Sequence, residues 1–318
     1  MIKNAHESEH DMELIDKVAI VTGSGQGLGL AYAKALAAAG AAVVINDVDG
    51  TKAKQAAEDI VEAGGRAVAE PVAVGTTEAG QQLVARAVDE FGRLDVMVTN
   101  AGVLRDKVLW NMSDDDFDTV IGVHLRGTFT CAREAVKQFR AAGNGGRLIL
   151  AGSPAGQRGN FGQTNYAAAK AGIVAMARTW AMECAKARVT VNAVVPNAAT
   201  VMTETIPFLA PYAKALQSGE DIPSVVRRAA SFGTAADVAG LVVYLASDES
   251  SAVTGQAIGI GGDRLSLWSH PREISSAFLD GGWDADAISD AFGSSVGEQL
   301  ESYGIPLPKI PTTVEAGA

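Results

Sequence analysis

Residues 18–29 read VAIVTGSGQGLG and join a short apolar run to a glycine-rich turn. The run Val18–Thr22 predicts a buried strand, and an alanine-rich helical pattern follows the glycines. Glycines allow a tight turn and let the backbone approach a pyrophosphate, which then rests at the positive N-terminus of the helix. A glycine-rich stretch alone is weak evidence, but this one lies between a strand and a helix, as a dinucleotide site requires. The residues predicted to contact the dinucleotide here are Gly23, Gln26, Gly27 and Leu28.

The same alternation of strand and helix patterns continues along most of the chain. Further strand-like runs are Ala42–Asn46, Arg66–Val72, Leu94–Thr99, Arg147–Ala151, Thr190–Val195 and Ala257–Ile260. They are continuously apolar, as strands buried on both faces of a parallel sheet must be. We therefore expect an α/β fold with a single doubly wound, Rossmann-like parallel sheet of about seven strands and helices on both faces. Ligands of such sheets bind at the carboxyl ends of the strands.

Bulk composition excludes several classes of function. The formal net charge of −11 argues against nonspecific nucleic-acid binding, which needs a basic surface. No apolar run is long enough to cross a bilayer, and the polar N-terminus lacks the apolar core of a signal peptide. The two cysteines, Cys131 and Cys184, are expected to be reduced core thiols. We expect a cytoplasmic protein that binds a small molecule rather than a nucleic acid or a membrane.

Asp47 ends the second strand-like run, about the usual interval after the glycine-rich turn. A carboxylate at this position accepts hydrogen bonds from the adenosine ribose hydroxyls and repels a 2′-phosphate. No lysine or arginine stands in the glycine-rich loop or immediately after Asp47 to favour NADP. The alternative is a solvated turn residue, or a cap for the helix that begins near Thr51. The context favours NAD as the cofactor.

Tyr166 and Lys170 are four residues apart in a long helical pattern, so both side chains lie on one helix face. A tyrosine is a poor base at neutral pH, but a nearby ammonium stabilises its phenolate. Tyr166 could then take a proton from an alcohol, while Ser153, just past the fifth strand, hydrogen-bonds the substrate oxygen. On its own such a pair is usually an exposed helix face, but together with the cofactor signature it is much more specific. The predicted site contains no metal.

These motifs resemble the short-chain dehydrogenase/reductase family over about residues 17–262. The resemblance rests on TGSGQGLG, on TNAG at Thr99–Gly102, on Ser153 and on NYAAAK. It implies a catalytic core of Ser153, Tyr166 and Lys170, and homodimers or homotetramers. It also implies that Asn100, Ala101 and Gly102 pack under the adenine, and that Tyr166, Lys170, Pro196 and Thr200 contact the cofactor, with Thr200 near the nicotinamide carboxamide.

Two departures from the family pattern narrow the match. Most members have an asparagine where this chain has His124, and a glycine where it has Asn197. With NAGVLRDK and GNFGQTNY, these departures resemble the dehydrogenase domain of peroxisomal multifunctional enzyme type 2 and its bacterial relatives. That resemblance implies oxidation of a (3R)-hydroxyacyl-CoA, including one whose acyl group carries a steroid. His124 is expected either to support a proton-relay water or only to pack inside its helix. The segment Ala73–Gly75 lacks the acidic residue that the family often places near the adenine.

Outside the catalytic domain, at 17–262, we expect a polar N-terminal segment at 1–16 and a C-terminal extension at 263–318. The extension contains Trp268, Trp283 and Tyr303, which are expected to pack on their own domain or on a partner subunit. Residues 197–231 carry three prolines and no clean period, which predicts a mobile loop or short helices beside the active site.

The main alternative function is a dehydrogenase or reductase of a 17β-hydroxysteroid or another free secondary alcohol, which needs no recognition of CoA. Candidate partners for CoA phosphates are Arg158, Arg227, Arg228 and Arg264, although isolated arginines are more often solvated surface residues. A reductase of carrier-protein thioesters is disfavoured because Asp47 disfavours NADPH. A nucleotide-binding sensor without activity is disfavoured because the chain keeps Ser153, Tyr166 and Lys170.

Overall fold

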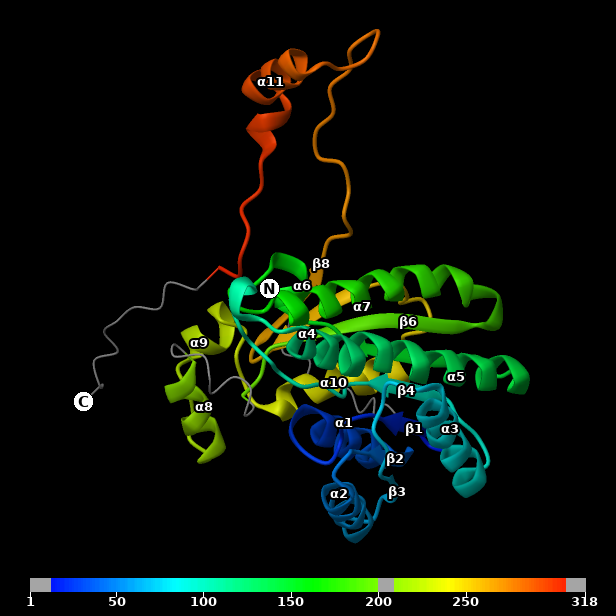
Figure 1. Cartoon of the computed structure of the whole chain (residues 1–318). Helices are drawn as coiled ribbons and strands as arrows, with labels where there is room; N and C mark the ends of the chain where they lie inside the picture. Colours follow the sequence, from blue (N-terminus) through cyan, green and yellow to red (C-terminus); the bar gives the residue numbers. More distant parts are fainter. Residues whose placement is uncertain (1–12, 200–208, 307–318) are drawn as a thin grey trace, which may run out of the picture.

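A mostly parallel sheet runs through the computed structural model of the chain, which describes residues 13–199 and 209–306 (Figure 1). Its strands in chain order are β1 (Val18–Val21), β2 (Ala42–Asn46), β3 (Arg66–Glu70), β4 (Val96–Thr99), β5 (Gly146–Ala151), β6 (Val189–Pro196), β7 (Ala257–Gly261) and β8 (Arg264–Trp268). Their spatial order is β3-β2-β1-β4-β5-β6-β7-β8, and only the β7–β8 pair is antiparallel. The seven predicted strands and the doubly wound sheet are confirmed.

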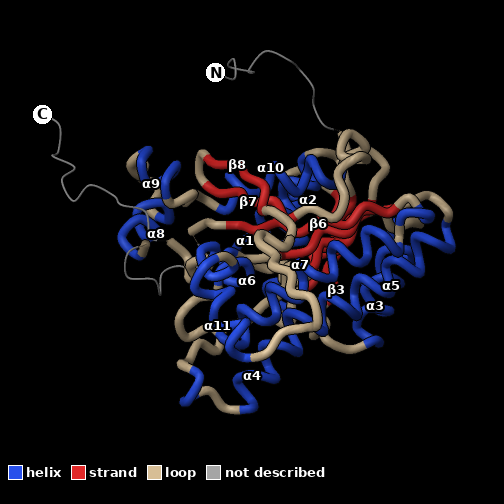
Figure 2. Tube along the Cα trace, turned by 90° about the horizontal axis from the view of Figure 1, so that it is seen from above, coloured by secondary structure: helices blue, strands red, loops and turns tan. Residues whose placement is uncertain are grey.

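Helices cover both faces of the sheet (Figure 2). One face carries α1 (Gly27–Ala38), α2 (Gly50–Glu62) and α10 (Ala235–Ala246), and the other carries α3 (Thr77–Phe91), α5 (Gly127–Ala142) and α7 (Thr164–Glu183). Side chains alternate along β1: Ala19 and Val21 enter the first core, and Val18 and Ile20 enter the second. This is the physical reason why β1 is apolar at every position.

Short helices complete the described part of the chain. They are α4 (Asp114–Val120), α6 (Pro154–Arg158), α8 (Ala210–Gln217), α9 (Ser224–Ala229) and α11 (Ala285–Ser294). For residues 197–231 the sequence predicted a mobile loop or short helices, and the described part contains the short helices α8 and α9. They bury a small cluster that includes Leu209, Val226 and Phe232. Residues 200–208, which include Thr200, lie outside the described residues. None of the helices in the described ranges is both long and apolar enough to span a membrane.

The eighth strand, β8, is an addition that the sequence interpretation missed. Its sequence RLSLW alternates apolar and polar residues, whereas most of the other strands are predominantly apolar. β8 is the last strand in the order of the sheet, and its exposed side chains include the apolar Leu265 and Leu267, whereas Ser266 and Trp268 are partly buried. The dipeptide Gly262-Asp263 between β7 and β8 is a two-residue hairpin connection. This hairpin signal was available in the sequence.

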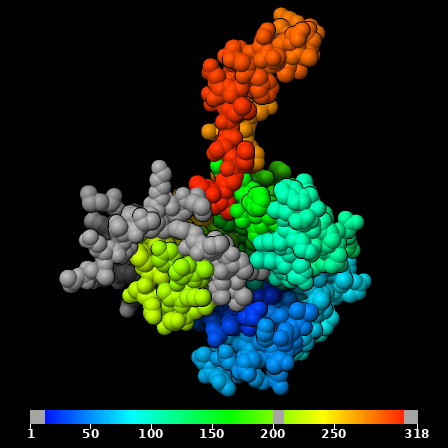
Figure 3. All heavy atoms as spheres, turned by 60° about the vertical axis from the view of Figure 1, so that its left-hand side comes forward, coloured from blue at the N-terminus to red at the C-terminus, as the bar shows by residue number. Residues whose placement is uncertain are grey.

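After β8 the chain leaves the domain as a long excursion that carries α11 (Figures 1 and 3). We call residues 269–303 the arm. It returns to the domain at Gly304, whose N–H donates to the carbonyl oxygen of Arg158 at 2.7 Å. The return point therefore lies at the end of α6, the helix that begins directly after Ser153.

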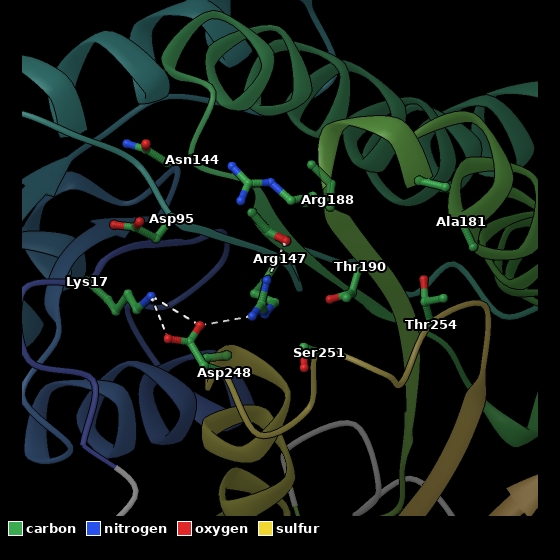
Figure 4. Close-up of a pocket in the computed structure, with 15 residues that line it drawn as sticks. Lys17, Asp95, Asn144, Arg147, Ala181, Arg188, Thr190, Asp248, Ser251 and Thr254 are labelled. Carbon is green, nitrogen blue, oxygen red and sulfur yellow. Dashed lines mark hydrogen bonds and ion pairs between the residues drawn. The ribbon is translucent and has the colours of Figure 1, made fainter.

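At the amino ends of the central strands, a cavity of about 510 Å³ is lined by charged side chains (Figure 4). Lys17 and Arg147 both donate to the Asp248 carboxylate, at 3.2 and 3.0 Å. Arg188 donates to the carbonyl oxygen of Gly143, the residue that ends α5. These groups form hydrogen bonds with one another and with the end of a helix. We therefore interpret them as a structural network that stabilises this edge of the sheet.

Candidate active site

The glycine-rich turn is shaped by two close approaches of backbone to backbone. Gly23 has a φ of +62°, and a Cβ there would lie 2.7 Å from the Cα of Ala101. A Cβ on Gly29 would collide with the carbonyl oxygen of Gly23. Gly27 has a φ of +59° and begins α1, and no atom of the described residues lies within 4 Å of the place of its missing Cβ. The turn is thus tightly packed at Gly23 and Gly29 and open at Gly27, where α1 begins, as a pyrophosphate site must be.

Asn100 ties the turn to the next strand. Its side-chain amide donates to the carbonyl oxygens of Thr22 and Gly23 at 3.1 and 3.0 Å. The Thr22 hydroxyl accepts hydrogen bonds from the N–H groups of Asn100 and Ala101 at 2.9 and 3.1 Å. These bonds join the carboxyl ends of β1 and β4, so Asn100, Ala101 and Gly102 line the same edge as the turn.

Asp47 lies directly after β2 and faces the glycine-rich turn. One carboxylate oxygen accepts from the N–H of Gly25 at 3.2 Å, and the other accepts from the N–H of Asp49 at 3.0 Å. Asp49, and not Asp47, caps α2. Lys52, which the sequence interpretation overlooked, donates from its ammonium to the Gln26 side chain at 3.0 Å. Helix α2 therefore brings a cation to the loop, although none stands next to it in sequence.

The turn, the open helix N-terminus and Asp47 fit the pyrophosphate and the adenosine ribose of a nicotinamide dinucleotide. Gly23, Gln26, Gly27 and Leu28 would lie along its pyrophosphate, and Asp47 would face its adenosine ribose. Pro196, the last residue of β6, and Lys170 stand further along the same carboxyl edge of the sheet. No cluster of three or more potential metal-ligating side chains occurs within residues 13–199 and 209–306.

Ser153, Tyr166 and Lys170 meet at the carboxyl end of β5. Ser153 is the N-cap of α6, and its hydroxyl accepts the N–H of Ala155 at 3.2 Å. Tyr166 and Lys170 lie one turn apart on α7, with the Lys170 Nζ 5.6 Å from the centroid of the Tyr166 ring. Lys170 is buried and donates to the carbonyl oxygen of Ala151 at 2.6 Å. The predicted trio is thus assembled around one point of the sheet edge.

Burial sets the protonation of these groups. It lowers the pKa of Lys170 to about 7 and raises the pKa of Tyr166 above its ordinary value of 10, although the hydrogen bond with Ser153 opposes the second shift. The charge of Asp106 also raises the pKa of Tyr166. The lowering of the tyrosine pKa by Lys170 that the sequence predicts is therefore not found in the protein alone, where burial raises that pKa. Any phenolate needs further positive charge at the site.

His124 packs edge-on against Tyr166, with ring centroids 5.2 Å apart and an interplanar angle of 87°. It lies in a short π-helical segment, Ile121–Arg126, of a kind often found at functional sites. Its Nε2 lies 2.8 Å from the carbonyl oxygen of Val103, and its Nδ1 is buried without a hydrogen-bond partner among the described residues. Burial lowers its pKa to about 3, so the ring is neutral near pH 7. A Cβ on Gly102 would collide with this ring, which explains the glycine.

Asn165 is a positioning residue that sequence reasoning missed. It is fully buried, and its amide donates to the carbonyl oxygens of Arg105 and Asp116 at 3.1 and 3.0 Å. Its side-chain oxygen accepts from the N–H of Tyr166 at 2.7 Å. Asn165 thus links the start of α7 to α4 and to the loop after β4. Its place directly before Tyr166 was the only signal in the sequence.

The four arginines that the sequence suggests as partners of CoA phosphates differ in their surroundings. Arg227 is engaged by Asp237 and Asp263, and Arg158 by the returning end of the arm. The Arg228 side chain is 77% exposed and forms one long ion pair, at 3.8 Å, with Asp263. Arg264 lies exposed on β8. Arg228 and Arg264 are therefore the two best placed to meet a phosphate.

The protein-family profile described as enoyl-(acyl carrier protein) reductase matches residues 23–262. A solved structure, a short chain dehydrogenase from Mycobacterium avium, is 34% identical, with a TM-score of 0.76 over 92% of this chain and 98% of that one. Together with the fold and the assembled trio, these matches place the chain in the short-chain dehydrogenase/reductase family, as an oxidoreductase.

Curated relatives are similar to the chain at comparable identities. The 3-oxoacyl-[acyl-carrier-protein] reductase FabG of Thermotoga maritima is 38% identical over 79% of this chain and 98% of its own length. The hydroxyacyl-CoA dehydrogenase ChsB1 of Mycobacterium tuberculosis is 38% identical over 87% of each chain. Peroxisomal multifunctional enzyme type 2 of Drosophila melanogaster is 37% identical over 91% of this chain, which spans about half of that protein. The resemblance to multifunctional enzyme type 2 and its bacterial relatives is confirmed.

Proposed function

We propose that this protein uses NAD⁺ to oxidise the 3-hydroxyl of a (3R)-hydroxyacyl-CoA. The observation that carries the proposal is the joint presence, on one sheet edge, of the Ser153–Tyr166–Lys170 cluster and of Asp47 facing the glycine-rich turn. The cluster supports alcohol oxidation, and the carboxylate of Asp47 favours a cofactor without a 2′-phosphate. The acyl-CoA substrate is supported by ChsB1, whose similarity covers 87% of both chains.

The proposed chemistry assigns one task to each side chain. The Ser153 hydroxyl donates to the substrate oxygen and holds it beside the Tyr166 hydroxyl, which takes the alcohol proton as a phenolate. The Lys170 ammonium, held by the Ala151 carbonyl, stabilises that phenolate electrostatically. Bound NAD⁺ would supply the hydride acceptor and a positive charge near the tyrosine. Because burial alone raises the Tyr166 pKa, we expect the tyrosine to become an effective base only in the complex.

His124 is proposed to position Tyr166 rather than to exchange protons. Its ring is neutral near pH 7 and packs against the tyrosine ring at right angles. An edge-to-face contact of this kind orients the second ring. His124→Asn should therefore change the rate without moving the pH at which activity rises.

The names of ChsB1 and FabG both describe chemistry on an acyl thioester. The acyl group is carried by CoA in the first and by the acyl carrier protein in the second. Asp47 favours NAD and oxidation, whereas Lys52 beside Gln26 is a cation that a 2′-phosphate could use. Fluorescence titration of NADH and NADPH tests the cofactor separately from the substrate. We expect NADH to bind at least tenfold more tightly.

The substrate is tested by NADH formation with three alcohols: a short (3R)-hydroxyacyl-CoA, a (3R)-hydroxyacyl-CoA with a steroid side chain, and a free 17β-hydroxysteroid. We expect kcat/KM for a CoA ester to exceed that for the free steroid by at least about a hundredfold, or about 2.7 kcal/mol of transition-state discrimination. A preference for the free steroid would replace the acyl-CoA proposal with the alternative of a free-alcohol dehydrogenase.

A further inference from the structure

Two arginines with little counter-charge stand where α9 meets the hairpin between β7 and β8, at the carboxyl ends of the parallel strands (Figure 2). We call this place the arginine corner. The Arg228 side chain is 77% exposed, and its one ion pair, with Asp263, is long at 3.8 Å. Arg264 is exposed and forms no ion pair among the described residues. Both guanidinium groups are therefore available to an anion from solution.

Asp263 does not neutralise the two arginines because a third one occupies it. The Arg227 guanidinium lies 2.6 Å from the Asp263 carboxylate and 3.2 Å from the Asp237 carboxylate. The corner thus combines three cations, Arg227, Arg228 and Arg264, with two carboxylates, which leaves one positive charge. The whole chain has a formal net charge of −11, so this corner is positive on an otherwise acidic protein. Such a local charge attracts anionic ligands.

The two arginines are carried by backbone segments that pack directly against each other. A Cβ on Gly262 would lie 2.6 Å from the carbonyl oxygen of Arg227. The N–H of Asp263 donates to the same oxygen at 3.3 Å. Arg228 and Arg264 directly follow Arg227 and Asp263 in the chain, so their Cα positions are fixed relative to each other. A binding site for one anion between two guanidinium groups needs such a fixed base.

The register of the sheet places the arginine corner level with the catalytic centre. Ser153 follows β5 at the height of Pro196 on β6, and Pro196 pairs with Ile260 on β7. The next residue of β7, Gly261, pairs with Arg264 on β8. Three strand spacings of about 4.8 Å, or roughly 14 Å, therefore separate Ser153 from Arg264 across the sheet.

The strand order also sets the direction in which a long substrate can extend. The glycine-rich turn and Asp47 follow β1 and β2, on one side of β5, whereas the arginine corner lies beyond β6 on the other side. A substrate that meets Ser153 and continues away from the cofactor passes toward this corner. The pantetheine arm of CoA has about the length of an extended chain of four residues, or roughly 14 Å. Its far end carries the pyrophosphate.

We propose that Arg228 and Arg264 hold the pyrophosphate of the acyl-CoA substrate between their guanidinium groups. Guanidinium groups bind phosphate oxygens through paired, charge-assisted hydrogen bonds. The arginine corner recognises the carrier, whereas Ser153, Tyr166 and Lys170 act on the 3-hydroxyl. This inference rests on the proposed function and identifies the part of the substrate that the catalytic trio does not contact.

Binding of the carrier tests the site without turnover. Isothermal titration calorimetry of the full-length protein with NADH compares CoA, 3′-dephospho-CoA and pantetheine, which share the pantetheine arm and differ in their phosphates. We expect CoA and 3′-dephospho-CoA to bind within about threefold of each other, and pantetheine at least about tenfold more weakly. Similar affinities of CoA and pantetheine would overturn the proposal. A 3′-dephospho-CoA that binds as weakly as pantetheine would also overturn it, because the 3′-phosphate would then be the group recognised.

The double substitution Arg228→Gln and Arg264→Gln should remove most of the difference in affinity between CoA and pantetheine. Arg66→Gln, at an exposed arginine of β3 on the opposite side of the sheet, is the matched control and should keep that difference. Circular dichroism checks that each variant is folded. An unchanged difference in the double variant, or an equal loss in the Arg66 variant, would contradict the assignment of the two arginines.

Kinetics with two thioesters, (3R)-hydroxybutyryl-CoA and (3R)-hydroxybutyryl-pantetheine, separates this site from the catalytic proposal. The double variant should raise KM for the CoA ester at least about tenfold with little change in kcat, a split that a general loss of structure would not give. If the wild type oxidises neither ester, the proposed function fails, and the calorimetry still decides whether the arginines bind the pyrophosphate. A double variant that loses activity toward a (3R)-hydroxyacyl-(acyl carrier protein) but not toward the CoA ester would overturn the proposal in favour of a carrier protein.

Discussion

Charged side chains are arranged differently at the amino ends and at the carboxyl ends of the central strands, which we call the amino edge and the carboxyl edge of the sheet. At the amino edge, Lys17 and Arg147 share the Asp248 carboxylate, whose side chain is 75% exposed (Figure 4). At the carboxyl edge, Lys170 is buried against the Ala151 carbonyl oxygen and forms no ion pair among the described residues. Exposed paired charges hold elements together at little energetic cost, whereas a buried cation without a counterion destabilises the fold. The difference indicates that the carboxyl edge is maintained for chemistry and the amino edge for structure.

The largest expected effect comes from removing the Tyr166 hydroxyl. Tyr166→Phe should lower kcat/KM by about 10³-fold, because general acid–base groups contribute about 10²–10⁴-fold. The fold and the dinucleotide site keep their other contacts, so the dissociation constant of NADH should change less than about threefold. Steady-state kinetics and fluorescence titration measure the two quantities. A variant that retained wild-type turnover would remove the proposed base.

Lys170→Met should lower kcat/KM by about 10²-fold and change how stability depends on pH. Burial lowers the folded-state pKa of Lys170 from about 10.5 to about 7, so between these pH values the folded state binds fewer protons than the unfolded state. The free energy of unfolding of the wild type therefore rises with pH across this window. Replacing Lys170 should remove that rise, as measured by denaturant unfolding at pH 7 and pH 10. Identical pH slopes in both proteins would contradict the lowered pKa of the buried Lys170.

Gly102→Ala should destabilise the carboxyl edge. Its Cβ would collide with the His124 ring, and overpacking typically costs about 1–3 kcal/mol. The displaced ring would also disturb Tyr166, so kcat should fall together with stability. Gly240→Ala is a matched control on the exposed side of α10, with no described atom within 4 Å of its missing Cβ, and should stabilise the protein by up to about 1 kcal/mol. Equal effects of the two substitutions would show that His124 does not set the need for glycine.

Asp47→Ala should change cofactor preference more than catalysis. We expect the ratio of kcat/KM for NAD over NADP to fall about tenfold, because the ribose loses an anionic acceptor and a 2′-phosphate loses a repelling charge. Lys52→Gln is the opposing control, because it removes a cation bonded to the glycine-rich loop and should weaken use of NADP. An unchanged ratio in the Asp47 variant would mean that other residues determine the preference for NAD over NADP.

The smallest effect is expected at the amino edge. Asp248→Asn breaks two ion pairs of an exposed carboxylate, and such pairs contribute about 0–1 kcal/mol each. We expect the free energy of unfolding to fall by about 1 kcal/mol or less, and kcat/KM to change less than twofold. A large loss of activity would mean that the two edges are coupled, and the contrast between them would no longer hold.

The strands and the catalytic trio followed from the sequence because their signals are local. Continuous apolar runs mark strands that are buried on both faces, and Tyr166 and Lys170 sit at helical spacing. The missed features depend on residues that only the fold brings together: Lys52 reaches Gln26 across two elements, and the partners of Asn165 lie 49 and 60 positions away. The direction of the Tyr166 pKa shift also depends on burial, which spacing does not report.

The C-terminal extension also shows what the sequence alone could not predict. The sequence indicated aromatic residues that need a surface to pack on, and the fold places most of the arm away from its own domain (Figure 3). Strand β8 was missed because its alternating pattern differs from the mostly apolar runs of the other strands. Its hairpin dipeptide Gly262-Asp263 would have identified it.

The most direct test of the account is hydride transfer from a substrate that carries deuterium at C3. (3R)-[3-²H]-hydroxybutyryl-CoA, its (3S) enantiomer and NAD⁺ are incubated with the purified protein, and the NADH formed is analysed by mass spectrometry. The account predicts singly deuterated NADH from the (3R) substrate and at least a hundredfold less from the (3S) substrate. Absence of deuterated NADH from the (3R) substrate, or equal transfer from both enantiomers, would contradict it.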